Sequence, residues 1–391
     1  MIQFDFDKDC YGCGLCAEIC PMQAITMVEN KDGFKVPQID ANKCIGCSKC
    51  DRFCIRLQKS KKNIDITQSE IYAFYIENVA QRIDSTSGGA FYAIAKQFIE
   101  EKGVVCGCVW NEKMEAEIVA AESMREVDRM RGSKYVQSDI KCFSKIEEAL
   151  KVGKKVLFSG VPCQVAAAQR KFGSSDRFYT IALLCEGTAS PKAWKMYKHE
   201  LEQEANSEMV GAIHRQKGVY GWISPIAEYT FANGEKKHTL SFTLDEYVHN
   251  MIYGFFTRNS CYSCQFKGNN STADIMIGDF WGLPKDLMKK SKNKGCSVVL
   301  VNTDKGKEMF ADINHCYKEL TNLEVVQRRN PPLLHPAEKN PYRDIVLQEM
   351  DTLGFHAAVM KYCNMNTKKV KAQRILHRLR LVGLAKRILR G

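Results

Sequence analysis

The 391-residue sequence lacks a long apolar run, because no segment reaches about 18 uninterrupted apolar residues. No N-terminal stretch combines a basic start, an apolar run and a small-residue cleavage site. Net charge is scarce outside the last residues: of the total of +12, residues 368–391 carry nine Lys or Arg and no Asp or Glu, which leaves only about +3. These absences predict a cytoplasmic protein, and they argue against nucleic-acid binding, which needs basic residues and aromatics spread over a folded face.

Cysteine, in contrast, is abundant, with 18 residues. Secreted disulfide scaffolds are short chains, whereas here eight of the cysteines fall in two repeated runs with metal-ligand spacing. The cysteines therefore predict metal sites in a reducing compartment. The length suits two domains with appendages, and 45% hydrophobic with 26% charged residues is the balance of a globular protein.

The two runs have the spacing of 4Fe-4S ligands. They read Cys10-x2-Cys13-x2-Cys16-x3-Cys20-Pro21 and Cys44-x2-Cys47-x2-Cys50-x3-Cys54. Three thiolates two residues apart can hold three corners of one cubane, while the fourth reaches the partner cluster. This predicts one cluster on Cys10, Cys13, Cys16 and Cys54, and a second on Cys44, Cys47, Cys50 and Cys20. Structural zinc is the alternative, although zinc sites usually use separated CxxC pairs.

Strands and helices alternate after a polar break at residues 59–63. Strands are predicted near 71–76, 104–110, 156–158, 179–184, 274–278 and 296–301, and helices near 91–99, 146–151 and 162–173. Strands separated by single helices predict an α/β fold, α+β overall, whose mainly parallel sheet is covered on both faces. The expected domains are a ferredoxin-like module at 1–62, an α/β domain at 66–345 with parts at 66–145 and 150–345, and a basic helical tail at 346–391.

A Ser-Gly-Gly turn at residues 87–89 stands immediately before the helix predicted from Phe91. Free backbone amides at a helix N-terminus, with glycines that allow close approach, form a natural seat for a phosphate or pyrophosphate. An ordinary helix N-cap is the alternative interpretation.

Further motifs follow this turn in a specific order. They are Gly132-Ser-Lys-Tyr-Val-Gln-Ser138, Gly160-Val-Pro-Cys-Gln164, Cys185-Glu-Gly187, Cys261-Tyr-Ser-Cys264 and Asp274-Ile-Met-Ile-Gly-Asp279. Together they resemble the beta subunit of deazaflavin (coenzyme F420) hydrogenases and dehydrogenases over roughly residues 1–345. The resemblance implies a flavin-binding domain that holds FAD, with a further 4Fe-4S cluster beside it. It also implies flavin contacts at Ser87, Gly88, Gly89, Ser133, Lys134 and Tyr135.

The implied third cluster needs four more thiolates. Cys261-x2-Cys264 supplies a pair, and Cys163 and Cys185 each follow a predicted strand. Because the C-terminal ends of parallel strands share one edge of a sheet, their sulfurs could converge there. Buried core or reactive thiols are the alternative for Cys163 and Cys185.

Two basic segments keep more than one interpretation. Arg215-Gln-Lys217 resembles a family Arg-Asp-Lys stretch, so Lys217 and Arg215 are predicted to hold FAD phosphates or an anionic substrate, with an exposed basic hairpin as the alternative. The tail places Ile375, Leu376, Leu379 and Val382 at helical spacing. It is interpreted as an interfacial helix in peripheral membrane contact, a docking arm for an acidic partner, or a solvated helix.

The predicted function is an FAD-dependent iron-sulfur oxidoreductase. Clusters carry one electron and hydride carriers carry two, and a flavin bridges them. Electrons would move between an electron-transfer protein or redox complex, the clusters, FAD, and a deazaflavin coenzyme or another two-electron substrate. The alternatives are a non-catalytic electron-transfer subunit of a larger complex and a polyferredoxin-like scaffold. No catalytic residue is assigned from the sequence.

Overall fold

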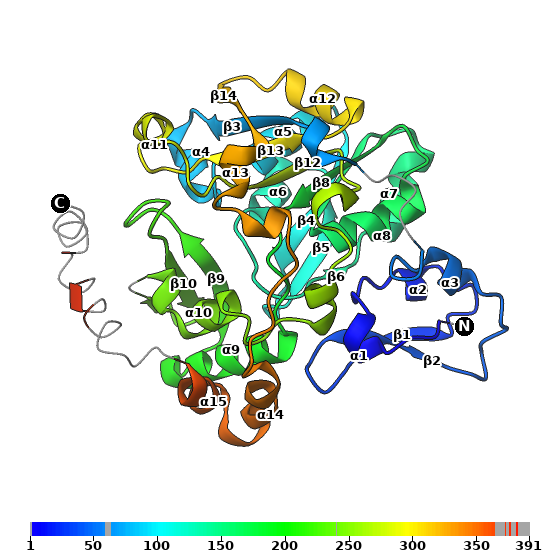
Figure 1. Cartoon of the computed structure of the whole chain (residues 1–391). Coiled ribbons are helices and arrows are strands. Elements are labelled where there is room, and N and C mark those ends of the chain that lie inside the picture. The colour runs from blue at the N-terminus through cyan, green and yellow to red at the C-terminus, as the bar shows by residue number, and fades with distance from the viewer. Residues whose placement is uncertain are drawn as a thin grey trace.

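The computed structural model describes residues 2–58, 64–239 and 241–363, with four single residues of the tail: Ala372, Ile375, Leu376 and Leu381. The chain forms a small N-terminal module, a large nine-stranded sheet covered by helices, and a smaller three-stranded sheet with its own helices (Figure 1). The rest of the predicted basic tail lies outside the described residues.

The N-terminal module contains α1 (Phe6–Asp9), α2 (Leu15–Glu18), β1 (Ile25–Glu29), β2 (Lys35–Ile39) and α3 (Lys49–Phe53). Strands β1 and β2 form an antiparallel hairpin whose turn lies at residues 30–34. Each cysteine run wraps around a short helix, and the side chains of Leu15, Ile19 and Ile55 are buried. We call residues 2–58 the ferredoxin module.

The large sheet has the order β14-β3-β13-β12-β8-β7-β4-β5-β6. The bounds are β3 (Glu70–Ile76), β4 (Val104–Trp110), β5 (Ala116–Ala121), β6 (Asp139–Ile140), β7 (Val156–Gly160), β8 (Phe178–Leu183), β12 (Ile275–Asp279), β13 (Ser297–Val301) and β14 (Cys316–Thr321). Strands β12, β8, β7 and β4 run parallel, and β5 and β6 form a second parallel pair. The pairs β4–β5, β12–β13, β13–β3 and β3–β14 are antiparallel.

The prediction of a mainly parallel sheet is therefore wrong, because the sheet is mixed. A tight turn between Asn111 and Glu115 returns the chain directly into β5, which forces an antiparallel pair with β4. Alternation of strands and helices along the sequence does not specify which strand lies beside which. The predicted strands themselves are present, with boundaries shifted by a residue or two.

Helices cover both faces of this sheet, as predicted. One face carries α5 (Ala90–Glu100), α6 (Met124–Met130) and α12 (Asp304–Ala311), and the other carries α7 (Phe143–Lys151), α8 (Pro162–Phe172), α11 (Lys285–Ser291) and α13 (Leu323–Gln327). The helix α4 (Val79–Asp84) follows β3. Proline at the first position starts α8, and the chain leaves that helix at Gly173.

The smaller sheet was not predicted. It contains β9 (Met209–Gln216), β10 (Ile226–Phe231) and β11 (Lys236–His238), and it packs with α9 (Pro191–Ala205), α10 (Glu246–Ile252), α14 (Arg343–Leu353) and α15 (Phe355–Tyr362). Short 3-10 helices lie at Ile66–Gln68, Phe242–Leu244, Gly268–Asn270 and Pro331–Leu333. Helices α14 and α15 bury Val346, Leu347, Met350, Phe355 and Val359, so the first part of the predicted tail belongs to this core. Among the described residues, no helix is long and apolar enough to cross a membrane.

Candidate functional site

The structure groups the cysteines of the two runs as their spacing predicts. One hollow on the module surface is lined by Cys20, Cys44, Cys47 and Cys50, and a second by Cys10, Cys13, Cys16 and Cys54. We call them the outer site and the inner site. Met22 and Ile45 are exposed beside the outer site. The fourth cysteine of each hollow thus comes from the other run, which fits the crossed arrangement of two-cluster ferredoxins.

Backbone amides point at the sulfurs of both sites. The amide nitrogen of Gly12 lies 3.3 Å from Cys10 Sγ, and that of Ala24 lies 3.3 Å from Cys20 Sγ. Gly12 has a φ of +66°, a conformation that places its amide toward the sulfur and that side chains disfavour. Such hydrogen bonds stabilise thiolates and clusters.

Four further cysteines come together at the edge of the large sheet. Cys163 lies in the first turn of α8 after β7, Cys185 follows β8, and the 3-10 helix η3 (Asn259–Ser263) presents Cys261 and Cys264. Burial raises the pKa of Cys163 well above its usual range, and the neighbouring thiols of Cys185, Cys264 and Cys261 raise it further. We call these four residues the main-domain site.

The main-domain site adjoins the inner site. The Cys13 thiol is close enough to act on the pKa of Cys163, and both side chains pack against the same hydrophobic core. The ring of Tyr11 lies 5.3 Å from that of Phe266, and its hydroxyl accepts a hydrogen bond from the Gln265 amide at 3.1 Å. The two groups of thiols are therefore neighbours across the boundary between the module and the large domain.

No group of three or more His, Cys, Asp or Glu side chains in the described part of the chain is placed to hold a single metal ion. A zinc ion would need four thiolates at about 2.3 Å from one point. A cubane instead keeps its thiolates at separate corners of a larger body. Each of the two module hollows is lined by four cysteines, the number of thiolates that one cubane takes.

A cluster of buried cations surrounds the Ser-Gly-Gly turn. The Lys217 ammonium donates hydrogen bonds to the carbonyl oxygens of Arg82 at 2.6 Å, Ser87 at 2.6 Å and Lys294 at 2.9 Å. The side chain of Arg82 is only 3% exposed, and its Nε and Nη1 atoms have no hydrogen-bond partner among the described residues. We call Arg82, Arg131, Lys217 and the turn at residues 85–89 the basic cradle.

Other predicted flavin contacts have structural partners at the cradle. Ser133 Oγ lies 3.2 Å from Thr86 Oγ1, and Lys134 Nζ donates to the Arg131 carbonyl at 2.8 Å. Gly89 caps α5 in the left-handed conformation. At Gly88 a Cβ atom would overlap the Phe74 carbonyl oxygen and come within 2.6 Å of the Ser297 amide nitrogen, so this glycine is needed for packing between strands.

The interpretation of residues 215–217 as an exposed basic hairpin is wrong. Both Arg215 and Lys217 are buried, at 6% and 2% exposed. Arg215 forms an ion pair with Asp279 at the end of β12, and Asp279 also accepts a hydrogen bond from Trp222 Nε1 at 2.5 Å. Asp279, on a strand about 60 residues later in the sequence, therefore supplies the carboxylate that the family stretch has at the position of Gln216.

The tyrosine at position 135 contacts the smaller sheet. Its amide donates to His214 Nδ1 at 3.1 Å, and the two rings stack with centroids 5.6 Å apart. Burial lowers the pKa of His214 to about 3, so its imidazole is neutral at physiological pH. Sequence reasoning missed Arg82, Arg131 and His214. A basic residue five positions before the Ser-Gly-Gly turn was the available indication for Arg82.

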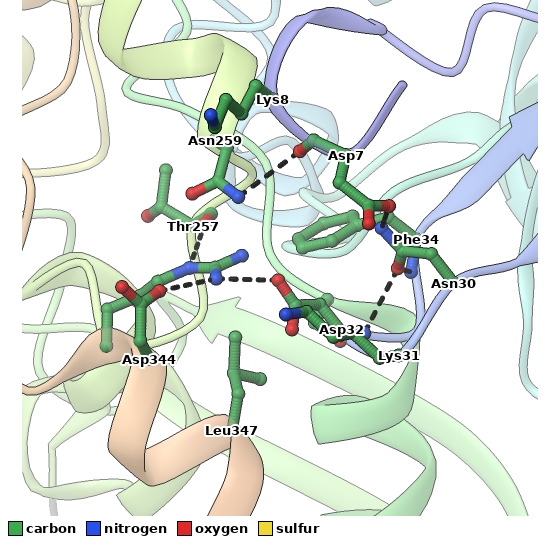
Figure 2. Close-up of polar contacts among 12 residues, drawn as sticks. Asp7, Lys8, Asn30, Lys31, Asp32, Phe34, Thr257, Asn259, Asp344 and Leu347 are labelled. Carbon is green, nitrogen blue, oxygen red and sulfur yellow. Dashed lines mark hydrogen bonds and ion pairs between the residues drawn. The ribbon is translucent and has the colours of Figure 1, made fainter. Parts of the chain in front are cut away.

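A buried ion pair holds the ferredoxin module against α14, which packs on the smaller sheet. Asp32, in the turn of the β1–β2 hairpin, lies 2.6 Å from Arg343 of α14, and Arg343 also donates to Asp344 at 2.8 Å and to the Thr257 carbonyl at 2.8 Å. Figure 2 shows Asp32 and Asp344 approaching this guanidinium from the hairpin and from the helix. Ser190 Oγ donates to the Asp32 carbonyl at 2.5 Å. We call Asp32 and Arg343 the latch.

Comparison with known proteins finds two family models that match parts of this chain. Residues 153–325 match the family model for the C terminus of the coenzyme F420 hydrogenase/dehydrogenase beta subunit, and residues 9–56 match a 4Fe-4S dicluster domain. The chain is therefore similar to these beta subunits over residues 153–325 and to two-cluster ferredoxins over residues 9–56. The resemblance predicted from the ordered motifs is confirmed.

Two individual proteins are similar to this chain at low sequence identity. One subunit of the F(420)H(2) dehydrogenase of Methanosarcina mazei is 24% identical over 315 residues, which are 77% of this chain and 81% of the relative. A chain in a solved structure of the xenon-derivatized F420-reducing [NiFe] hydrogenase complex from Methanosarcina barkeri is 17% identical to this chain. The match covers 75% of this chain and 96% of that chain, with a TM-score of 0.45. The second likeness is too weak to show a shared fold.

Proposed function

We propose that this chain is the iron-sulfur electron-transfer subunit of a deazaflavin-linked redox complex. The observation that carries the proposal is the contact between the inner site and the main-domain site, because the Cys13 and Cys163 thiols are electrostatic neighbours. A relative that is an F(420)H(2) dehydrogenase subunit supports the same class of complex. The subunit role takes precedence over the catalytic role that the sequence suggested first.

The three thiol sites follow one another from the surface inward. The outer site lies on the module with Cys47 exposed, the inner site is partly covered, and the main-domain site lies at the sheet edge. A 4Fe-4S cluster, when bound, accepts and releases one electron. The exposed outer site is the natural point of contact for a protein that exchanges electrons with this chain.

A second candidate function, flavin catalysis, is favoured by the basic cradle. The Arg82 guanidinium stacks on the Tyr75 ring at 4.4 Å, but its Nε and Nη1 donors lack hydrogen-bond partners among the described residues. A buried cation with unused donors is costly, and an anionic phosphate is a suitable partner for it. FAD would bring two phosphates, and its flavin exchanges electrons singly or in pairs. In this chain Arg82 and Arg131 would bind the phosphates beside the α5 N-terminus, while Lys217 shapes the turn through its three carbonyl bonds.

The experiment that tests the proposed function is anaerobic purification with iron, sulfide and flavin quantified. We expect about twelve irons and about twelve sulfides per chain, the content of three cubanes. About eight irons would leave only the ferredoxin module and contradict the role of the main-domain site. One FAD per chain would support the catalytic candidate, and its absence would leave the electron-transfer subunit.

Replacing Arg82 with glutamine tests the cradle separately. We expect FAD to bind at least tenfold more weakly, a loss of about 1.4 kcal/mol, because the uncompensated guanidinium beside the phosphates is removed. Titration of FAD into flavin-depleted protein measures the change. Arg125→Gln is the matched control, because Arg125 is exposed on α6. Equal affinity of Arg82→Gln and wild type would place FAD elsewhere.

A further inference from the structure

Arg258 binds the ferredoxin module from inside the large domain. It precedes η3, and its own carbonyl oxygen accepts from the Cys261 amide at 3.0 Å. Its guanidinium donates to the Cys10 carbonyl from Nε at 2.6 Å and to the Lys35 carbonyl from Nη2 at 2.9 Å. One side chain therefore connects the segment that presents a main-domain cysteine with the backbone of an inner-site cysteine.

The fit around this guanidinium is tight. The Nη1 atom lies 3.1 Å from Gln137 Oε1, and the ring of Phe34 lies 5.0 Å from the guanidinium carbon. A Cβ atom at Gly12 would come within 2.6 Å of Nη1 and 2.7 Å of the Lys35 carbonyl oxygen. Glycine at position 12 thus allows the first cysteine run to lie directly on Arg258.

Within the described residues, the charge of Arg258 has no carboxylate partner in its hydrogen bonds. All three acceptors are uncharged oxygens, although the side chain is only 2% exposed. Two other buried arginines differ in this respect, because Arg343 pairs with Asp32 and Arg215 with Asp279. A buried cation without a counterion is unfavourable unless negative charge lies nearby.

Negative charge would come from the thiolates on either side. Arg258 donates to the backbone of Cys10, and its own carbonyl accepts from the amide of Cys261. Arg258 is thus an electrostatic neighbour of one cysteine in the inner site and one in the main-domain site. Lowering the negative potential at both places also favours the addition of an electron there.

We propose that Arg258 is the positioning residue for electron transfer between the inner site and the main-domain site: it fixes the distance between them and raises the reduction potentials of the clusters they hold. The inference rests on the proposed function. One electron leaves one cluster and enters the other, with no bond formed or broken, and the redox partner of the outer site supplies or removes it. The guanidinium stays protonated throughout.

The test compares Arg258→Gln and Arg258→Lys in the intact, cluster-loaded protein by potentiometric titration with electron paramagnetic resonance. We expect Arg258→Gln to lower the equilibrium constant for reduction of the inner and main-domain clusters at least tenfold. For one electron this is a decrease of about 59 mV in reduction potential. It should also weaken the magnetic coupling between these two reduced clusters. Arg258→Lys keeps the charge but loses the planar guanidinium. We therefore expect its equilibrium constants for reduction to stay within twofold of wild type, while the magnetic coupling becomes weaker.

The controls separate this role from general loosening. Arg343→Gln disturbs the same interface at a charge that Asp32 already neutralises, so its potentials should stay at wild-type values. Wild-type potentials and coupling in Arg258→Gln would overturn the inference. If Arg258→Gln does not fold, unchanged coupling in Arg258→Lys overturns it. Absence of a main-domain cluster in the wild type would instead contradict the proposed function.

Discussion

Replacing Cys264 with serine is expected to lower the iron content from about twelve to about eight per chain. Cys264 is one of four thiols in the main-domain site, and burial raises its pKa, so a correctly placed thiolate there depends on the metal it binds. Serine is a poor ligand for iron in such a site. The two module sites use none of these four residues and should keep their clusters.

The functional consequence is interruption of electron flow. The ferredoxin module of Cys264→Ser should still be reduced by an electron-transfer protein, while a flavin in the cradle should be reduced only by dithionite. Stopped-flow spectroscopy follows both chromophores. Cys316→Ser is the control, because Cys316 lies on β14, where its thiol donates to the Ile313 carbonyl at 3.0 Å. If the partner protein reduced the flavin of Cys264→Ser at the wild-type rate, electrons would not pass through the main-domain site.

Replacing Asp32 with asparagine is expected to weaken the docking of the ferredoxin module by about 3 kcal/mol, the lower end of the range for a broken buried ion pair. The side chains of Arg343 and Asp32 are 2% and 11% exposed, so water does not replace the lost charge. The remaining bond from Arg343 to Asp344 compensates for the lost charge only in part, since that carboxylate is 60% exposed.

Hydrogen exchange measures this change directly. The amides of residues 30–35 should exchange faster in Asp32→Asn, because the hairpin turn opens locally without unfolding the large sheet. Glu29→Gln is the matched control: Glu29 pairs with Lys195 of α9 at 2.7 Å, but both side chains are more than 30% exposed, and the expected loss is below about 1 kcal/mol. Equal protection in both variants would show that the latch does not hold the module.

Particular elements show where prediction from the sequence worked. The groups of Cys10 with Cys54 and of Cys20 with Cys44 follow from spacing within two short runs, since local geometry and one crossing decide them. The main-domain cysteines lie near one another, as expected from two cysteines that follow parallel strands, and their role as cluster ligands stays a prediction. Strands β9 to β11 were missed because glycines and polar residues interrupt their pattern.

The cysteine runs, the helices and strands with strong periodicity, and the similarity to the beta subunits could be read from the sequence alone, because each depends on residues close together or on the order of motifs. Only the tertiary structure decided the mixed sheet, the burial of Lys217, the partner of Arg215 and the contacts of Arg258 and Arg343 with the module. The presence of a basic residue in the sequence does not tell whether its side chain is solvated or buried. Its environment depends on backbone carbonyls and carboxylates brought from distant segments, which no local pattern specifies.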